Sequence, residues 1–184
     1  MDTRALRVPP LPESEWTDAM RDALGGRASS GRASNLFTTL ARHPELLQRW
    51  LVFGGHILGG STLTARAREL VILRTGHRCK SDYEWGQHAF IAKRVGISEE
   101  EIRRVIDGPD APGWDPFEAT LLRAADELHD TQVLSDATWA ELSAQYDVKQ
   151  LLDLVFTVGQ YTMVSMALNT LGIQREANVG GFPS

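Results

Sequence analysis

The sequence lacks the features that mark several classes of protein. It has one cysteine, Cys79, in 184 residues, which excludes an intrachain disulfide and any metal site made of cysteines alone. Its 19 Lys and Arg against 24 Asp and Glu give a net charge of −5, so it has no basic excess for nucleic acid. No run approaches the roughly 18 apolar residues of a membrane span, and no apolar secretory segment opens the chain. We expect a soluble, cytoplasmic protein with no nucleic-acid partner and no membrane partner.

Strand patterns are missing as well. No segment combines alternating apolar and polar residues with β-branched enrichment. Apolar residues recur instead at helical spacing, and capping residues divide the segments, as at Thr64, Asp115, Asp147 and the pair Ser98 and Glu101. With 42% hydrophobic residues, a chain of this length can bury a sizeable core. We predict an all-α fold, a bundle of about eight helices.

The chain divides into three parts by composition. Residues 1–34 are predicted to form a proline-rich arm, a helix, and a Gly/Ser-rich mobile loop at 25–34. Residues 35–176 form the helical domain, and residues 177–184 form a loop-like tail. The last long helix, from Asp147 on, is apolar nearly all round. Such a helix lies in the core or forms half of a subunit interface, and we expect a homo-oligomer.

The segment 69–96 carries the richest group of ionisable side chains on the predicted helices. Glu84 and His88 are four residues apart, so they project from one face of a helix. A carboxylate beside an imidazole favours the imidazolium and orients the ring, as general acid/base catalysis requires. A short turn between two antiparallel helices would place Glu69 opposite His88. We predict that these three residues form the catalytic cluster.

A purely structural interpretation of the same segment stays open. Ser81 and Glu84 fit the S-x-x-E pattern of a helix capping box, which would explain both residues without function.

The spacing resembles the core motif of the carboxymuconolactone decarboxylase family, which includes the alkylhydroperoxidase D group. In the peroxidase branch that motif is a Glu, eleven residues, C-x-x-C, three residues and a His. Here Glu69 is followed by eleven residues, then Ser81-Asp82-Tyr83-Glu84, then three residues and His88. Ser81 and Glu84 thus stand where both cysteines would be, which resembles the non-redox, decarboxylase-like branch. A looser resemblance covers about 35–172.

The resemblance implies an alkylhydroperoxidase D-like bundle that assembles as a dimer, trimer or hexamer. It also implies a decarboxylase-like lyase without a cofactor, which uses acid/base chemistry on a small carboxylated, lactone-bearing acid. His88 would donate or accept the proton, with Glu84 and Glu69 as its carboxylates. Nearby cationic, polar and aromatic side chains would bind this small-molecule substrate. They are Arg74, His77, Arg78, Ser81 and Trp85. Arg74 and Arg78 could instead pair with nearby acids.

Two other functions stay open. Cys79 lies between Arg78 and Lys80, near a predicted helix start, and these charges would lower its pKa. It could then serve a one-cysteine, alkylhydroperoxidase-like antioxidant activity, or it could be a buried residue without chemistry. The fold could also bind a small molecule without turnover. The segment 126–130, DELHD, has metal-ligating residue types but no second ligand cluster, so we predict no metal site.

Overall fold

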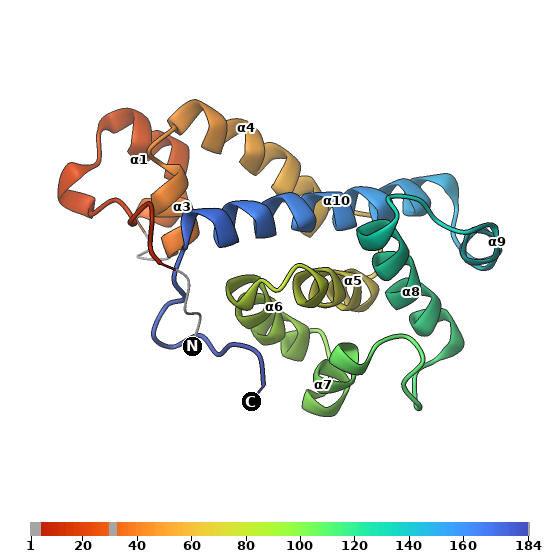
Figure 1. Ribbon diagram of the computed structural model, residues 1–184. Coiled ribbons are helices and arrows are strands. Elements are labelled where there is room, and N and C mark those ends of the chain that lie inside the picture. The colour runs from red at the N-terminus through yellow and green to blue at the C-terminus, as the bar shows by residue number, and fades with distance from the viewer. Residues whose placement is uncertain (1–4, 30–32, 184) are drawn as a thin grey trace.

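The structure is a computed structural model that describes residues 5–29 and 33–183, and the regular elements in these ranges are all helical (Figure 1). The prediction of an all-α fold with about eight helices is confirmed, and two of the ten α-helices have only four and six residues. The helices are α1 Asp18–Leu24, α2 Gly26–Ser29, α3 Asn35–Leu40, α4 Pro44–Gly55, α5 Ala65–Arg78, α6 Asp82–Arg94, α7 Glu99–Asp107, α8 Pro116–Asp130, α9 Asp136–Ser143 and α10 Val148–Leu171. A 3-10 turn, Glu13–Glu15, precedes α1, and a π-helical turn, His56–Gly60, follows α4.

Helix α5 lies at the centre of the bundle, packed against α6, α8 and α10 (Figure 1). Every residue from Glu69 to Gly76 is buried, so α5 has no solvent-facing side over two turns. The long α10 crosses the molecule above α5 and α6, with α1, α3 and α4 at one end and α8 and α9 at the other. Polar residues on this part of α5 therefore sit among other helices, where they need partners.

The capping residues expected from the sequence are confirmed. The side chains of Thr64, Asp115 and Asp147 each accept a backbone N–H at the start of α5, α8 and α10. Ser98 and Glu101 form the expected capping box of α7.

One local prediction differs from the structure. Of the segment 25–34, expected to be a mobile loop, Gly26–Ser29 form the short helix α2, while residues 30–32 lie outside the described residues. The glycine-flanked run at 54–60 does not end the helical path after α4, because His56–Gly60 form a π-helical turn. Ile57 in this turn is buried, and its packing accounts for the helical continuation through the glycines.

The C-terminal segment returns to cover α6. Arg175 pairs with Asp82 at 2.6 Å, and the backbone N–H of Phe182 donates to the same carboxylate at 2.7 Å. Gly86 permits the close approach, because a Cβ atom there would lie 2.0 Å from the carbonyl oxygen of Gly180. Helix α6 is thus enclosed between α5 and the end of the chain.

Arg74 joins three helices from a buried position on α5. Its guanidinium donates twice to Asp126 on α8, at 2.7 and 2.8 Å, and to the carbonyl oxygens of Val105 and Ile106 at the end of α7. Gly108, with φ of +95°, leaves room for it, since a Cβ atom there would lie 2.9 Å from Arg74 Nη2. One turn later, Arg78 pairs with Asp130 at 2.6 Å in a partly exposed position.

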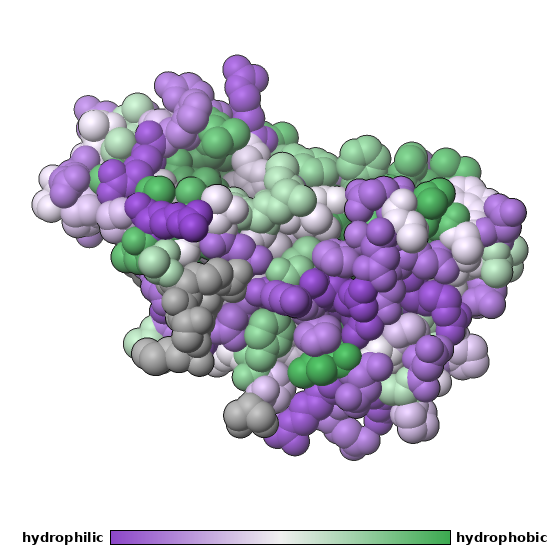
Figure 2. Space-filling model, in the orientation of Figure 1, coloured by the Kyte–Doolittle hydropathy of each residue, from purple (hydrophilic) through white to green (hydrophobic). Residues whose placement is uncertain are grey.

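Helix α10 has an apolar stripe on its outer face. Figure 2 shows apolar residues gathered along the edge of the molecule that α10 forms. The exposed residues of this stripe are Val148, Leu152, Val155, Phe156, Met163 and Met166. By length and composition α10 could cross a membrane, with a mean hydropathy of 1.4, although the sequence was expected to contain no such segment. However, 56% of that window is buried inside the protein, as in the core helix of a globular bundle.

We expect Arg74→Ala to lower the free energy of unfolding by about 3–5 kcal/mol, because it leaves a partly buried carboxylate and two carbonyl groups without the donor that Arg74 supplies. Arg78→Ala is the matched control on the same helix, with an expected loss of about 0–1 kcal/mol for a more exposed pair. Urea unfolding of both variants measures the difference. Equal losses would show that Arg74 does not hold the three helices together.

We propose that the stripe on α10 binds a second copy of the chain, which accords with the expected homo-oligomer. The six exposed residues of the stripe, none of them charged, extend over 19 residues of α10, or about 27 Å of helix. Phe156→Glu should therefore convert the assembly to monomers in light scattering coupled to gel filtration. Phe90→Glu, at an exposed phenylalanine of α6 away from the stripe, should leave the assembly intact. A wild-type monomer would contradict the proposal.

Candidate functional site

The three residues predicted as catalytic meet between α5 and α6. Glu69 comes from the buried stretch of α5, while Glu84 and His88 lie one turn apart on the face of α6 toward it. His88 Nδ1 is 2.6 Å from Glu69 Oε2, and His88 Nε2 is 3.1 Å from Glu84 Oε1. Their exposed fractions are 0%, 5% and 4% for Glu69, Glu84 and His88, so a histidine is held between two carboxylates almost out of contact with solvent.

The electrostatics of the cluster favour the imidazolium form of His88. Burial opposes the charge, but hydrogen bonds to Glu69 and Glu84 and their negative charges outweigh it and raise the pKa of His88 to about 9. Both ring nitrogens therefore carry protons at neutral pH, and each donates to one carboxylate.

The structure contradicts the capping-box interpretation of Ser81 and Glu84. Ser81 does occupy the N-cap position of α6, but its side chain makes no capping hydrogen bond. Its buried hydroxyl oxygen has no hydrogen-bond partner within the described ranges. Glu84 instead turns inward to His88. Neither residue is explained by helix capping.

Two further residues complete the cluster, and the sequence analysis missed both. Arg68 Nε donates to Glu69 Oε1 at 3.2 Å, so a second cation lies beside the carboxylate. The ring of Tyr161 on α10 packs edge-on against the His88 ring, with 4.8 Å between the ring centroids. Burial raises the pKa of Tyr161 well above its usual value, as do the charges of Glu84 and Glu69, so it stays a neutral hydroxyl.

The other predicted substrate-binding residues are not hydrogen-bonded to this cluster. Arg74 and Arg78 pair with Asp126 and Asp130 of α8, which is the alternative that the sequence left open. Their guanidinium groups hold helices together, which argues against the expected role in binding a substrate carboxylate. Within the described residues no group of His, Cys, Asp and Glu is arranged to hold a metal ion.

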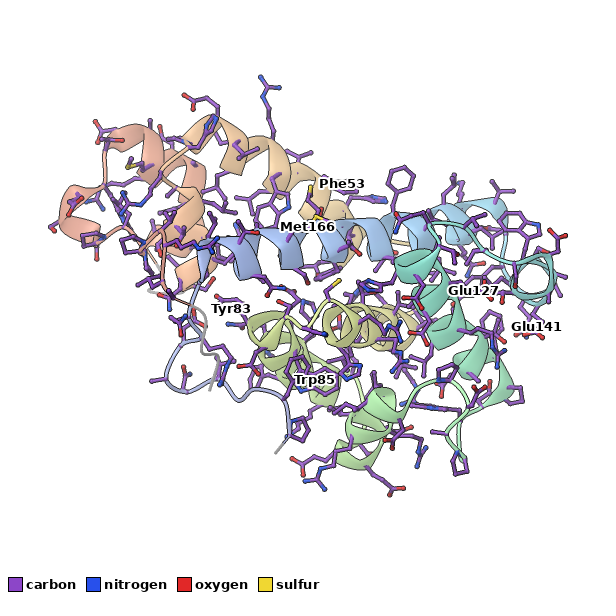
Figure 3. All side chains as sticks on the ribbon, viewed as in Figure 1. Phe53, Tyr83, Trp85, Glu127, Glu141 and Met166 are labelled. Carbon is purple, nitrogen blue, oxygen red and sulfur yellow. The ribbon has the colours of Figure 1, made fainter. Side chains whose placement is uncertain are left out.

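His77 and Trp85 belong to an aromatic group on the other side of α6. The Trp85 ring lies 5.2 Å from that of Phe182, and the His77 ring lies 5.8 Å from it. Burial, together with Arg74 and Arg78, lowers the pKa of His77. Figure 3 shows Trp85 on the side of α6 that faces away from α10.

That side of α6 also borders a cavity of about 570 Å³. Its walls come from α6, α7 and the C-terminal segment, and they include Trp85, Phe90 and Arg103. None of its lining residues is Glu69, Glu84 or His88. The cavity and the buried cluster are therefore separate parts of the molecule.

Cys79 differs from its expected chemistry. It caps the C-terminal end of α5 rather than the start of a helix, and that end of a helix disfavours a thiolate. Burial raises the pKa of the thiol, and hydrogen bonding by Thr162 and the charge of Arg78 offset this only in part. Its Sγ lies 3.6 Å from His129 Nδ1. The expected lowering of its pKa is wrong, because burial outweighs the neighbouring cations.

Comparisons with known proteins agree with this geometry. Residues 44–127, which include the whole Glu69 to His88 motif, match the sequence model of the Carboxymuconolactone decarboxylase family. This segment of the chain is therefore similar to the carboxymuconolactone decarboxylase family, and the whole chain has the alkylhydroperoxidase D-like fold. Its motif keeps the Glu and the His of the peroxidase branch and has Ser81 and Glu84 at the cysteine positions. No curated protein matches the sequence.

Solved structures of the same fold cover nearly the whole chain. An uncharacterized peroxidase-related protein from Silicibacter sp. TM1040 has a TM-score of 0.81 at 15% identity, covering 96% of this chain and 95% of that one. The alkylhydroperoxidase AhpD core protein from Ralstonia eutropha JMP134 has a TM-score of 0.79 at 17% identity, covering 94% and 95%. A cysteine-to-alanine variant of the debrominase Bmp8, in complex with 2,3,4-tribromopyrrole, has a TM-score of 0.73 at 14% identity, covering 95% and 94%. At these identities the likeness shows the fold.

The raised pKa of His88 predicts a pH dependence of stability. A group whose pKa is higher in the folded state than its ordinary 6.5 stabilises the fold fully below about pH 6, and this stabilisation is lost as the pH rises through about 9. Between about pH 6 and pH 10, wild type should therefore lose up to about 3 kcal/mol of unfolding free energy relative to His88→Gln. Denaturant unfolding across this range measures the difference. A constant difference would argue against the doubly paired imidazolium.

Proposed function

We propose that the protein is a decarboxylase-like enzyme that transfers protons to and from a small carboxylated organic acid, carboxylated lactones included. One observation carries this proposal: a buried imidazolium is hydrogen-bonded to two carboxylates, and one of these, Glu84, stands where the peroxidase branch has its second cysteine. Neither partner is needed for helix capping. A buried set of charged residues that helix capping does not explain is typical of a catalytic site.

The geometry divides the work between the two residues of α6. His88 is protonated at neutral pH, so it acts as an acid and not as a base. Glu84 uses one oxygen to accept from His88, and its second oxygen has no hydrogen-bond partner in the described parts of the chain. That oxygen can exchange a proton with a substrate, while His88 supplies the proton that Glu84 delivers. Glu69 keeps the imidazole ring oriented and charged.

In a decarboxylation the carbon–carbon bond to the carboxylate breaks, carbon dioxide leaves, and the electron pair stays on the remaining carbon. His88 passes its proton to Glu84, which delivers it to form the new carbon–hydrogen bond and becomes a carboxylate again. Solvent then restores the proton on His88, so atoms and charges balance. The neutral hydroxyl of Tyr161, beside the same carboxylates, is placed to donate a hydrogen bond to an oxygen on which negative charge develops.

A peroxidase reaction at Cys79 has less support. The shared fold includes peroxidase-related proteins, but the raised pKa of Cys79 keeps it a thiol, and the thiolate is the reactive form. No second cysteine is present to resolve an oxidised thiol. The tribromopyrrole complex of the debrominase supports the binding of a small ring by this fold.

The proposal is tested by incubating the purified protein with carboxymuconolactone and related carboxylated lactones in deuterium oxide. Carbon dioxide release and deuterium at the former carboxylate-bearing carbon, followed by NMR, are the expected results. Glu84→Gln and His88→Gln should each lower kcat by about 100-fold or more, because a general acid/base group contributes 10²–10⁴-fold. Wild-type kcat should fall as the pH rises through about 9, where His88 loses its proton.

Cys79→Ser is the matched control, and it should keep full turnover. Turnover that depends on Cys79 and survives Glu84→Gln would contradict the acid/base mechanism. Absence of turnover, with binding of the lactones that His88→Gln preserves, would favour a binding protein without catalysis.

A further inference from the structure

Helix α5 carries four arginines, and one of them differs from the others. The terminal Nη groups of Arg66, Arg74 and Arg78 donate to carboxylates of Glu118, Asp126 and Asp130. Arg68 donates only through Nε, to Glu69. Within the described residues its two Nη groups, with four N–H donors, have no acceptor.

Arg68 is nevertheless mostly buried. Its side chain is 12% exposed, against 31% for Arg78, whose Nη2 is paired. Its Nη atoms are not among the fully buried side-chain atoms that lack a partner, so this edge of the guanidinium is open to a ligand that enters from solvent. The same side chain belongs to the candidate site, because its Nε contacts Glu69 and its charge acts on Tyr161.

A guanidinium edge of this kind matches a carboxylate. Its two Nη groups can bind both oxygens of one carboxylate, a geometry that lysine cannot reproduce. The group held there would be one that the substrate retains, because a cation that stabilises the departing carboxylate would lose that interaction as neutral carbon dioxide forms. Arg68 would thereby fix the substrate at one end and leave its reacting carbon to Glu84.

We propose that Arg68 is the specificity-determining residue of the site, binding through its Nη groups a carboxylate that the substrate keeps through the reaction. This inference rests on the proposed function, since the acid bound by Arg68 is the one on which His88 and Glu84 act.

Charge balance adds a second expectation. Arg68 and His88 carry two positive charges, and Glu69 and Glu84 carry two negative charges, so the cluster is neutral before an acid binds. A bound carboxylate leaves one excess negative charge in a buried place, which favours uptake of a proton. Carboxylate binding should therefore be linked to proton uptake, whereas a merely structural Arg68 would give no such link.

The experiment uses an unreactive pair of probes, cyclopentanecarboxylate and its neutral isostere cyclopentanecarboxamide, added to the full chain. Calorimetry in buffers of different ionisation enthalpy gives the affinity and the protons taken up, and NMR of the histidine side chains reports contact with His88. Wild type should bind the carboxylate about tenfold or more tightly than the amide, with proton uptake. Arg68→Met should lose this preference and leave the weak amide binding unchanged. Arg68→Lys, which keeps the charge without the fork and serves if Arg68→Met does not fold, should lose part of it.

Arg103→Met is the matched control, because Arg103 is an exposed arginine that lines the cavity between α6, α7 and the C-terminal segment. It should bind both probes as wild type does. Loss of carboxylate binding in Arg103→Met but not in Arg68→Met would overturn the inference and place the acid in that cavity. Equal binding of both probes by wild type, or none of the carboxylate, would also overturn it. Because these readouts need no turnover, Arg68-dependent binding without catalysis would refute the proposed function alone, and turnover insensitive to Arg68 would refute this inference alone.

Discussion

The hydrogen bond between Glu69 and His88 is the interaction on which the site depends. It joins the centre of α5 to α6 at a point where both groups are almost completely buried. A buried carboxylate without its partner would be strongly unfavourable, so each residue needs the other to remain charged. Glu84 and Arg68 extend this pair into a neutral set of two cations and two anions. The bundle can therefore hold four charges in its interior without a net charge there.

Helix α5 carries two kinds of charged residue, those that pair with acids of a neighbouring helix and those that belong to the candidate site. The guanidinium groups of Arg74 and Arg78 form ion pairs with acids of α8. Glu69 and Arg68 belong instead to the cluster beside α6 and Tyr161. Both sets are on α5, but Arg74 and Arg78 each donate a terminal Nη group to a carboxylate, whereas no acceptor for the Nη groups of Arg68 lies among the described residues. The distinction between a residue that holds helices together and one that can bind a small molecule lies in how completely its hydrogen bonds are satisfied.

Much of the fold and the centre of the site could be predicted from the sequence, because their signals are local. Helical periodicity and capping residues such as Thr64 and Asp147 act within a few positions of each other. Glu84 and His88 share a helix face by spacing alone, and the family motif added Glu69. Tyr161 could not be found in this way, because 73 positions separate it from His88 and only the packing of α10 brings the two rings together. The pairing of Arg74 with Asp126 and the raised pKa of Cys79 could not be predicted for the same reason, since Asp126 and the residues that bury the thiol come from distant parts of the chain.

The return of the C-terminal segment onto α6 has a consequence for how the protein is made. Arg175 and Phe182 reach Asp82 across 93 and 100 positions of sequence, and Glu176 holds Tyr83 and Gln87 of the same helix. Until residues 175–182 have been synthesised, α6 lacks these partners. The helix that carries Glu84 and His88 thus gains its last contacts only after a further 93 to 100 residues have followed Asp82.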